Sequence, residues 1–200
     1  MSAEQSNPTR KDYAVSMLAA NFYGLVIGLP ILLLFSWAYT ARWTVFPLSQ
    51  GLEWTVANPL LMLGMFMVGI VAHEWLHGVS WALFGRLPFS EIKLGFQWKS
   101  LTPYAHVSRP IEIYAYRLGV IMPGLLIGFL PYMVGWLGGS PGWMMWGTVF
   151  TFAAYGDFLV FWLIRSVPRG SLVEDHPTMA GCSVVLPENN PHTEEITRQG

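Results

Sequence analysis

Long stretches without a charged residue restrict this chain to a small set of folds. No Asp, Glu, Lys or Arg occurs between Asp12 and Arg42, between Glu53 and Glu74, or from 118 to 156. Each stretch is long enough to cross a bilayer, which takes about 20 residues of helix. The composition agrees, because 53% of the residues are hydrophobic and 12% are charged, whereas about a quarter are charged in soluble domains.

We therefore expect a mainly α-helical, polytopic membrane protein with four transmembrane helices, in contact with the lipid bilayer. The third charge-free stretch contains the turn-forming sequence Gly-Gly-Ser-Pro-Gly, which divides it into two spans. The expected spans are about 18–39, 59–84, 118–137 and 143–165, within one domain from 18 to 165. Residues 1–17 are expected to form a cytoplasmic N-terminal segment, and 166–200 a cytoplasmic tail that is disordered towards its end.

The basic residues predict the orientation. Cytoplasmic termini place ten of the 11 Lys and Arg residues inside, with Arg42 alone outside, as the positive-inside rule requires. We therefore predict a multi-pass protein of the cell membrane with both termini in the cytoplasm. The net charge of −1 gives no basic field for nucleic acid, and the sequence does not indicate the oligomeric state.

Between the second and third spans, apolar and polar residues alternate, which is typical of a half-buried strand. The alternating apolar residues are Ile92, Leu94, Phe96 and Trp98. They predict a small β-hairpin at about 90–108 on the cytoplasmic side. Its edge could accept an extended substrate, or Phe96 and Trp98 could simply anchor it among lipid headgroups.

Three ionisable residues stand within the second span in the pattern His73-Glu74-x-x-His77. Residues four apart share one face of a helix, so both imidazoles can bind one Zn²⁺ ion. Glu74 could then act as the general base towards water bound to that zinc. Neutral core histidines are the alternative, but ionisable groups at this depth are costly unless they are paired or bind metal.

A catalytic zinc site needs a third protein ligand, and the single cysteine excludes a multi-cysteine site. The candidates are Glu91, His106, Glu112, Asp157, Glu174, Asp175 and His176. We favour Asp157, because His73 and Asp157 each lie fourteen residues into their expected spans, which is about 21 Å of helix.

Two other polar groups have open roles. His106 could contact substrate or stabilise an oxyanion, or it could be structural. The segment Glu174-Asp175-His176 could form a second metal site, although Asp-His-Pro equally suits a turn, and we favour a structural tail.

Four segments together resemble the family named "Putative zincin peptidase" of bacterial membrane proteins and, more distantly, the site-2 proteases, which cleave within the membrane. They are "HEWLHG", "PYAH" with "RPIEIYAYRLGVIMPG", "FTFAAYGDFL" and "LVEDHPTMAGC", between about Leu60 and Val185. The resemblance implies a membrane-embedded metallopeptidase with a third-ligand Asp on a later helix.

We therefore expect a zinc-dependent membrane-embedded peptidase of the HExxH type. Its catalytic residue would be Glu74, its metal ligands His73, His77 and Asp157, and its partner a protein substrate anchored in the membrane. A zinc transporter or sensor without hydrolytic activity could use the same ligands, and a scaffold protein would need no metal.

Overall fold

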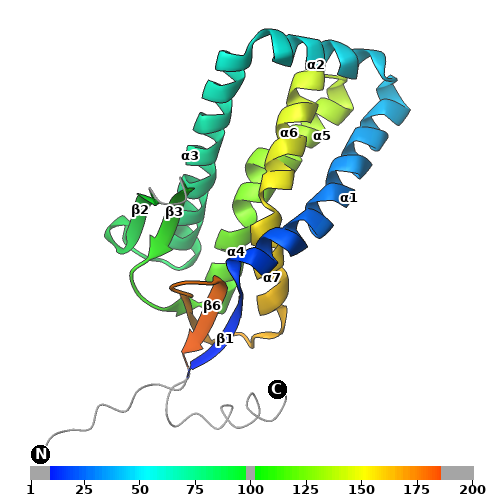
Figure 1. The fold of residues 1–200 in the computed structure, drawn as a ribbon. Coiled ribbons are helices and arrows are strands. Elements are labelled where there is room, and N and C mark those ends of the chain that lie inside the picture. The colour runs from blue at the N-terminus through cyan, green and yellow to red at the C-terminus, as the bar shows by residue number, and fades with distance from the viewer. Residues whose placement is uncertain (1–9, 98–101, 186–200) are drawn as a thin grey trace, which may run out of the picture.

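The computed structural model describes residues 10–97 and 102–185, and Figure 1 shows a bundle of helices with strands at one end. The helical elements are α1 (Met17–Trp43), α2 (Phe46–Ala57), α3 (Pro59–Phe84), η1 (Phe89–Glu91), α4 (Ile113–Pro123), η2 (Gly124–Phe129), α5 (Leu130–Gly138), α6 (Pro141–Ala153), α7 (Tyr155–Leu163) and η3 (Ile164–Ser166). The strands are β1 (Arg10–Val15), β2 (Ile92–Gln97), β3 (Thr102–Val107), β4 (Ile111–Glu112), β5 (Leu172–Asp175) and β6 (Ala180–Val185).

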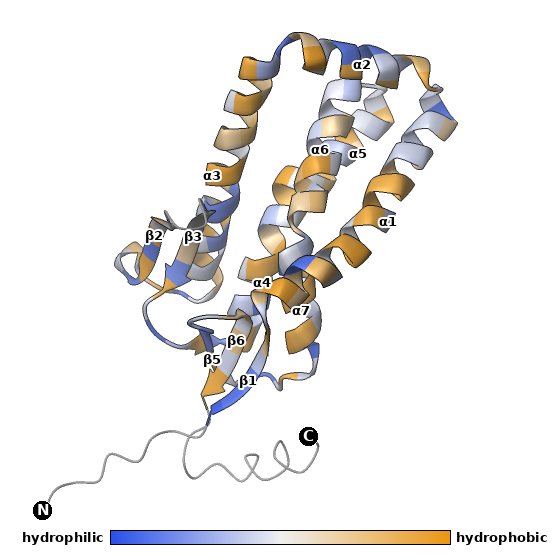
Figure 2. Ribbon diagram, in the orientation of Figure 1, coloured by the Kyte–Doolittle hydropathy of each residue, from blue (hydrophilic) through white to orange (hydrophobic). Residues whose placement is uncertain are grey.

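Three helices are long and apolar enough to cross a membrane: α1, α3 and the continuous unit from α4 through η2 to α5. Helices α6 and α7 reach that length only as a pair, which is bent by 44°. The hydropathy colouring in Figure 2 shows orange apolar residues along α1 and α3. The protein is thus mainly helical, with the apolar surface of a membrane protein.

Local sequence explains where the helices begin and end. The Ser16 side chain accepts a hydrogen bond from the Ala19 N–H at the start of α1, and Glu112 caps α4 by accepting from the Tyr114 N–H. Pro59 begins α3, where a missing N–H costs nothing. Gly139 ends α5 with a φ of 71°, a conformation that glycine adopts without steric cost.

Helix α2 is an element that the sequence analysis does not predict. It lies across the far ends of α1 and α3, at the end of the bundle opposite the strands (Figure 1). Several of its large apolar side chains are exposed, among them Phe46, Trp54 and Val56. A short helix of this kind suits the surface of a bilayer.

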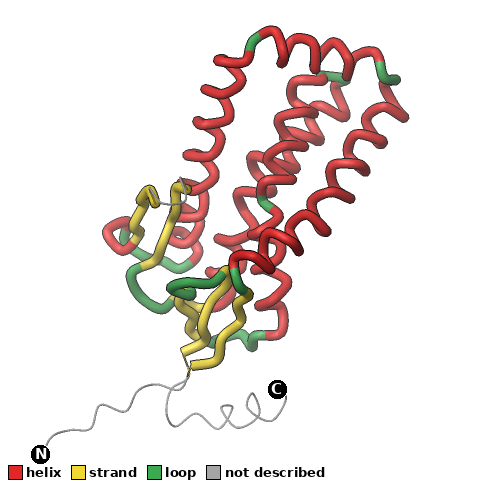
Figure 3. Tube along the Cα trace, viewed as in Figure 1, coloured by secondary structure: helices red, strands yellow, loops and turns green. Residues whose placement is uncertain are grey.

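The strands form two sheets (Figure 3). The expected hairpin is present as β2 and β3, paired antiparallel with Leu94 opposite Ala105. The second sheet has four antiparallel strands in the order β1-β6-β5-β4. It draws strands from both ends of the chain, in regions expected to be an N-terminal segment and a tail. The disorder expected towards the end of the tail and the Trp98 anchor lie outside the described residues.

The main core joins this four-stranded sheet to the ends of the helices. Its buried side chains include Trp81 of α3, Tyr116 of α4, Ile164 of η3 and Val173 of β5. This cluster fixes α3 and α4 relative to the strands. Trp81, its member on α3, lies one turn after His77.

Candidate metal centre

Helix α3 brings the three polar residues of its sequence motif together. His73 and His77 lie one turn apart, with ring centroids 4.9 Å from one another. Potential ligand atoms of His73, Glu74 and His77 all lie within 4.8 Å of each other. The spacing therefore gives the cluster expected of a metal site, and His77 is buried.

Asp157 lies against both histidines. Its Oδ2 is 2.9 Å from the Nε2 of His73, and its Oδ1 is 3.5 Å from the Nε2 of His77. The chain bends between α6 and α7, which places Asp157 in the first turn of α7. Two imidazoles from one helix and one carboxylate from another thus converge on the same point.

The second nitrogen of each imidazole tests whether this arrangement suits a metal. The Nδ1–H of His77 donates to the backbone oxygen of Gly119, 2.9 Å away, since a carbonyl can only accept. In the neutral imidazole the lone pair is then on Nε2, which faces the cluster, as in metal-binding histidines. The Nδ1 of His73 is buried with no partner among the described residues. A donor set of two imidazoles and a carboxylate is one that Zn²⁺ prefers.

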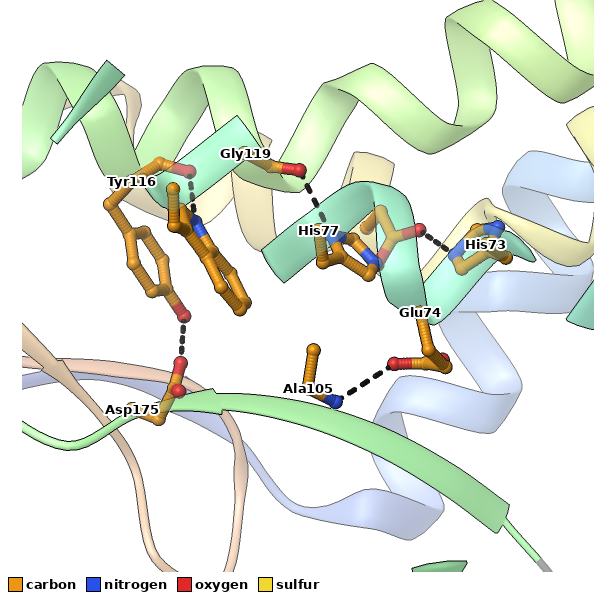
Figure 4. A network of polar contacts seen from close by, with 9 residues as sticks. His73, Glu74, His77, Ala105, Tyr116, Gly119 and Asp175 are labelled. Carbon is orange, nitrogen blue, oxygen red and sulfur yellow. Dashed lines mark hydrogen bonds and ion pairs between the residues drawn. The ribbon is translucent and has the colours of Figure 1, made fainter. Parts of the chain in front are cut away.

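Glu74 leaves α3 in a different direction from the histidines. One of its carboxylate oxygens, Oε2, accepts a hydrogen bond of 3.0 Å from the backbone N–H of Ala105 on β3 (Figure 4). The carboxylate therefore lies between the two histidines of α3 and the hairpin.

Aromatic rings support the buried histidine. Trp81, one turn after His77, stacks on it with centroids 5.4 Å apart and stacks on Tyr116 at 5.7 Å. The indole N–H of Trp81 donates to the backbone oxygen of Tyr116. A Cβ atom at Gly119 would overlap Trp81, so the absence of a side chain at Gly119 lets α3 and α4 approach this closely. Sequence reasoning missed these residues, because a backbone carbonyl and packed rings carry no chemical motif.

His106 makes its hydrogen bond outside the His-Glu-x-x-His motif. Its Nδ1 lies 2.9 Å from the Oδ2 of Asp175, and within the described ranges no hydrogen bond joins it to His73, Glu74 or His77. The bond to Asp175 raises the pKa of His106 above its ordinary value. His106 is therefore part of a separate polar cluster.

Most other candidates for a third ligand have structural contacts. Glu112 caps α4, Glu174 pairs with Arg10, and the Nδ1 of His176 accepts from the Thr178 and Met179 amides. In the part of the chain that the structure describes, the group with metal-site geometry is the one on α3. The contacts of the late Glu-Asp-His segment agree with the structural role that the sequence analysis favours.

An apolar cavity of about 690 Å³ opens between α2, α3 and α6. Trp54, Phe66, Trp146 and Phe150 are among its lining residues. Phe150 packs against Gly69, which is one turn before His73 on α3. The cavity therefore lies on the α2 side of the candidate metal centre and ends close to it.

Apolar helices around a His-Glu-x-x-His cluster, in which His77 is buried and His73 and Glu74 are partly buried, suggest a membrane protein with a zincin-type site. The chain belongs to the family named "Putative zincin peptidase", which matches residues 66–172. A relative from Pyrococcus woesei, named "Uncharacterized 24.7 kDa protein in gap 5'region", is 26% identical over 177 residues, 87% of this chain and 72% of the relative. No solved structure matches the chain. Family and motif together suggest a zinc peptidase.

Proposed function

We propose that this protein is a membrane-embedded zinc peptidase that hydrolyses peptide bonds of membrane or membrane-proximal proteins. The observation that carries the proposal is the convergence of His73, His77 and Asp157 beside Glu74, inside a bundle of apolar helices. Such a concentration of ionisable groups among apolar helices is typical of a functional site.

The residues that would hold the metal are His73, His77 and Asp157. The hydrogen bond from His77 to Gly119 supports this assignment, because it fixes the tautomer that binds a metal through Nε2. When bound there, Zn²⁺ would act as a Lewis acid towards water and the peptide carbonyl.

Glu74 would be the general base. Its Oε2 is held by the Ala105 amide, which leaves Oε1 to take a proton from the attacking water. The same carboxyl could then donate that proton to the nitrogen of the leaving amine.

Strand β3 would receive the substrate as an added strand. Opposite residues in an antiparallel ladder alternate between hydrogen-bonded and non-hydrogen-bonded pairs. Because Pro103 lacks an N–H, its pair with Phe96 is of the non-hydrogen-bonded kind. The pair of Leu94 and Ala105, two residues further on, is of the same kind. The N–H of Ala105 therefore points away from β2. Among the described strands β3 pairs with β2 alone. Its other edge lies beside the base, and an extended peptide would add there by taking over the Ala105 N–H that now donates to Glu74.

Four spans and cytoplasmic termini complete the proposal. The bent pair of α6 and α7 would serve as the fourth span, with Asp157 just beyond the bend. The apolar cavity that ends at Phe150 would suit the apolar part of a membrane-anchored substrate.

The proposal is tested by cleavage of reporter substrates with a single span, using full-length protein in detergent with zinc. We expect Glu74→Gln to keep zinc and to lower kcat at least ~100-fold, the usual contribution of a general base. Glu53→Gln, an acidic residue of α2, is the matched control and should cleave normally. Cleavage by Glu74→Gln would contradict the role of the base, and zinc without cleavage in the wild type would indicate a transporter or sensor.

A further inference from the structure

Asp175, at the end of β5, lies where three elements meet. Its Oδ1 accepts a 2.7 Å hydrogen bond from the hydroxyl of Tyr116 on α4. Its Oδ2 lies 2.9 Å from the Nδ1 of His106 on β3. One carboxylate thus joins the four-stranded sheet to both the hairpin and α4.

Both partners of Asp175 continue directly to the metal centre. On β3, the residue before His106 is Ala105, whose N–H donates to Glu74. On α4, Tyr116 stacks on Trp81, which stacks on His77. Figure 4 shows Asp175 below Tyr116, and Ala105 below Glu74, on the same side of α3.

We propose that Asp175 is a positioning residue: by holding His106 and Tyr116 together, it fixes β3 against α3, so that the Ala105 N–H meets the Glu74 carboxylate. The importance of this position for catalysis rests on the proposed function, because there Glu74 is the base and β3 the substrate strand. The positioning itself does not depend on the reaction.

A carboxylate is suited to this role because it can accept from two donors at once. Tyr116 is buried, and among the described residues its hydroxyl bonds to Asp175 alone. The loss of Asp175 would therefore leave a buried polar group without its acceptor. The raised pKa of His106 agrees with a charge-assisted bond to Asp175, with Glu174 contributing in the same direction and Lys93 opposing it. The neighbouring Glu174 contacts Arg10 at the surface instead, so it offers a matched control.

Amide hydrogen exchange in the full-length protein in detergent tests the proposal without zinc or substrate. In Asp175→Asn we expect exchange at Ala105 to become about tenfold faster, since a hydrogen bond to a charged group is lost. Amides in the middle of α4 should keep their wild-type rates. Glu174→Gln should leave Ala105 unchanged.

Unchanged exchange at Ala105 in Asp175→Asn would overturn the proposal, as would equal acceleration throughout the protein. If Asp175→Asn does not fold, Tyr116→Phe decides, because it keeps the stacked ring and removes the bond to Asp175. Faster exchange at Ala105 is then expected, and unchanged exchange contradicts the proposal. A wild-type protein that cleaves nothing would refute the proposed peptidase, while these exchange rates would still decide the role of Asp175.

Discussion

At the scale of single residues, the proposed metal centre is best defined at His77, because both of its ring nitrogens have a contact. His77 directs Nδ1 at Gly119 and Nε2 at Asp157. The sequence predicts the histidine pair and Glu74 from their spacing, and it favours Asp157 from its expected depth. It could not predict the carbonyl of Gly119, because every residue has a carbonyl and the fold alone decides which one faces His77.

Cys182, the single cysteine, should be unreactive in the folded protein. Its side chain is fully buried on β6, and burial raises the pKa of its thiol to about 12, so almost no thiolate forms at pH 8. We expect no labelling by a maleimide under native conditions and complete labelling in denaturant. Rapid native labelling would show that β6 is not packed as described.

The contact between His106 and Asp175 predicts a pH-dependent stability. The pKa of His106 is raised in the folded state, so its contribution is fully present below the unfolded value of ~6.5 and is lost as pH rises through the folded value. The difference in Tm between wild type and His106→Gln should therefore be larger at pH 6 than at pH 9. A difference that grows with pH would contradict the ion pair.

At the scale of elements, packing between α3 and α4 holds the proposed metal ligands of α3 in place. Gly119→Ala would force a methyl group into Trp81 and should destabilise the protein by about 1–3 kcal/mol, as overpacking does. Thermal unfolding in detergent measures the effect. Gly142→Ala, where an added Cβ meets nothing within 4 Å, is the control and should change Tm little.

The sequence predicts some helices and strands better than others. Helix α3 begins at Pro59 and ends at Phe84, matching its expected range, because length and apolar composition are local properties. The four-stranded sheet could not be found in the same way. Its β1–β6 pairing joins Arg10 to Val185, and no local pattern reports a contact between segments so far apart. Helix α2 was missed because it is shorter than a span.

At the scale of the whole molecule, the proposed orientation puts α2 outside the cell and the four-stranded sheet in the cytoplasm. Glu53→Cys and Thr178→Cys put an exposed thiol at each end of the molecule, and Cys182 is buried. A membrane-impermeant maleimide on intact cells should label Glu53→Cys and label Thr178→Cys only after lysis. The reverse pattern would invert the proposed orientation.

The zinc content of the purified protein is the direct test of the proposed metal centre. We predict a single zinc ion per chain in the wild type and in Glu74→Gln, since that variant keeps the proposed ligands. Asp157→Ala and His77→Ala should lose most of it, because each removes a proposed ligand. Glu174→Gln, outside the centre, should retain it. Full zinc content in Asp157→Ala and His77→Ala, or none in the wild type after growth and purification with zinc, would contradict a zinc centre built from α3 and α7.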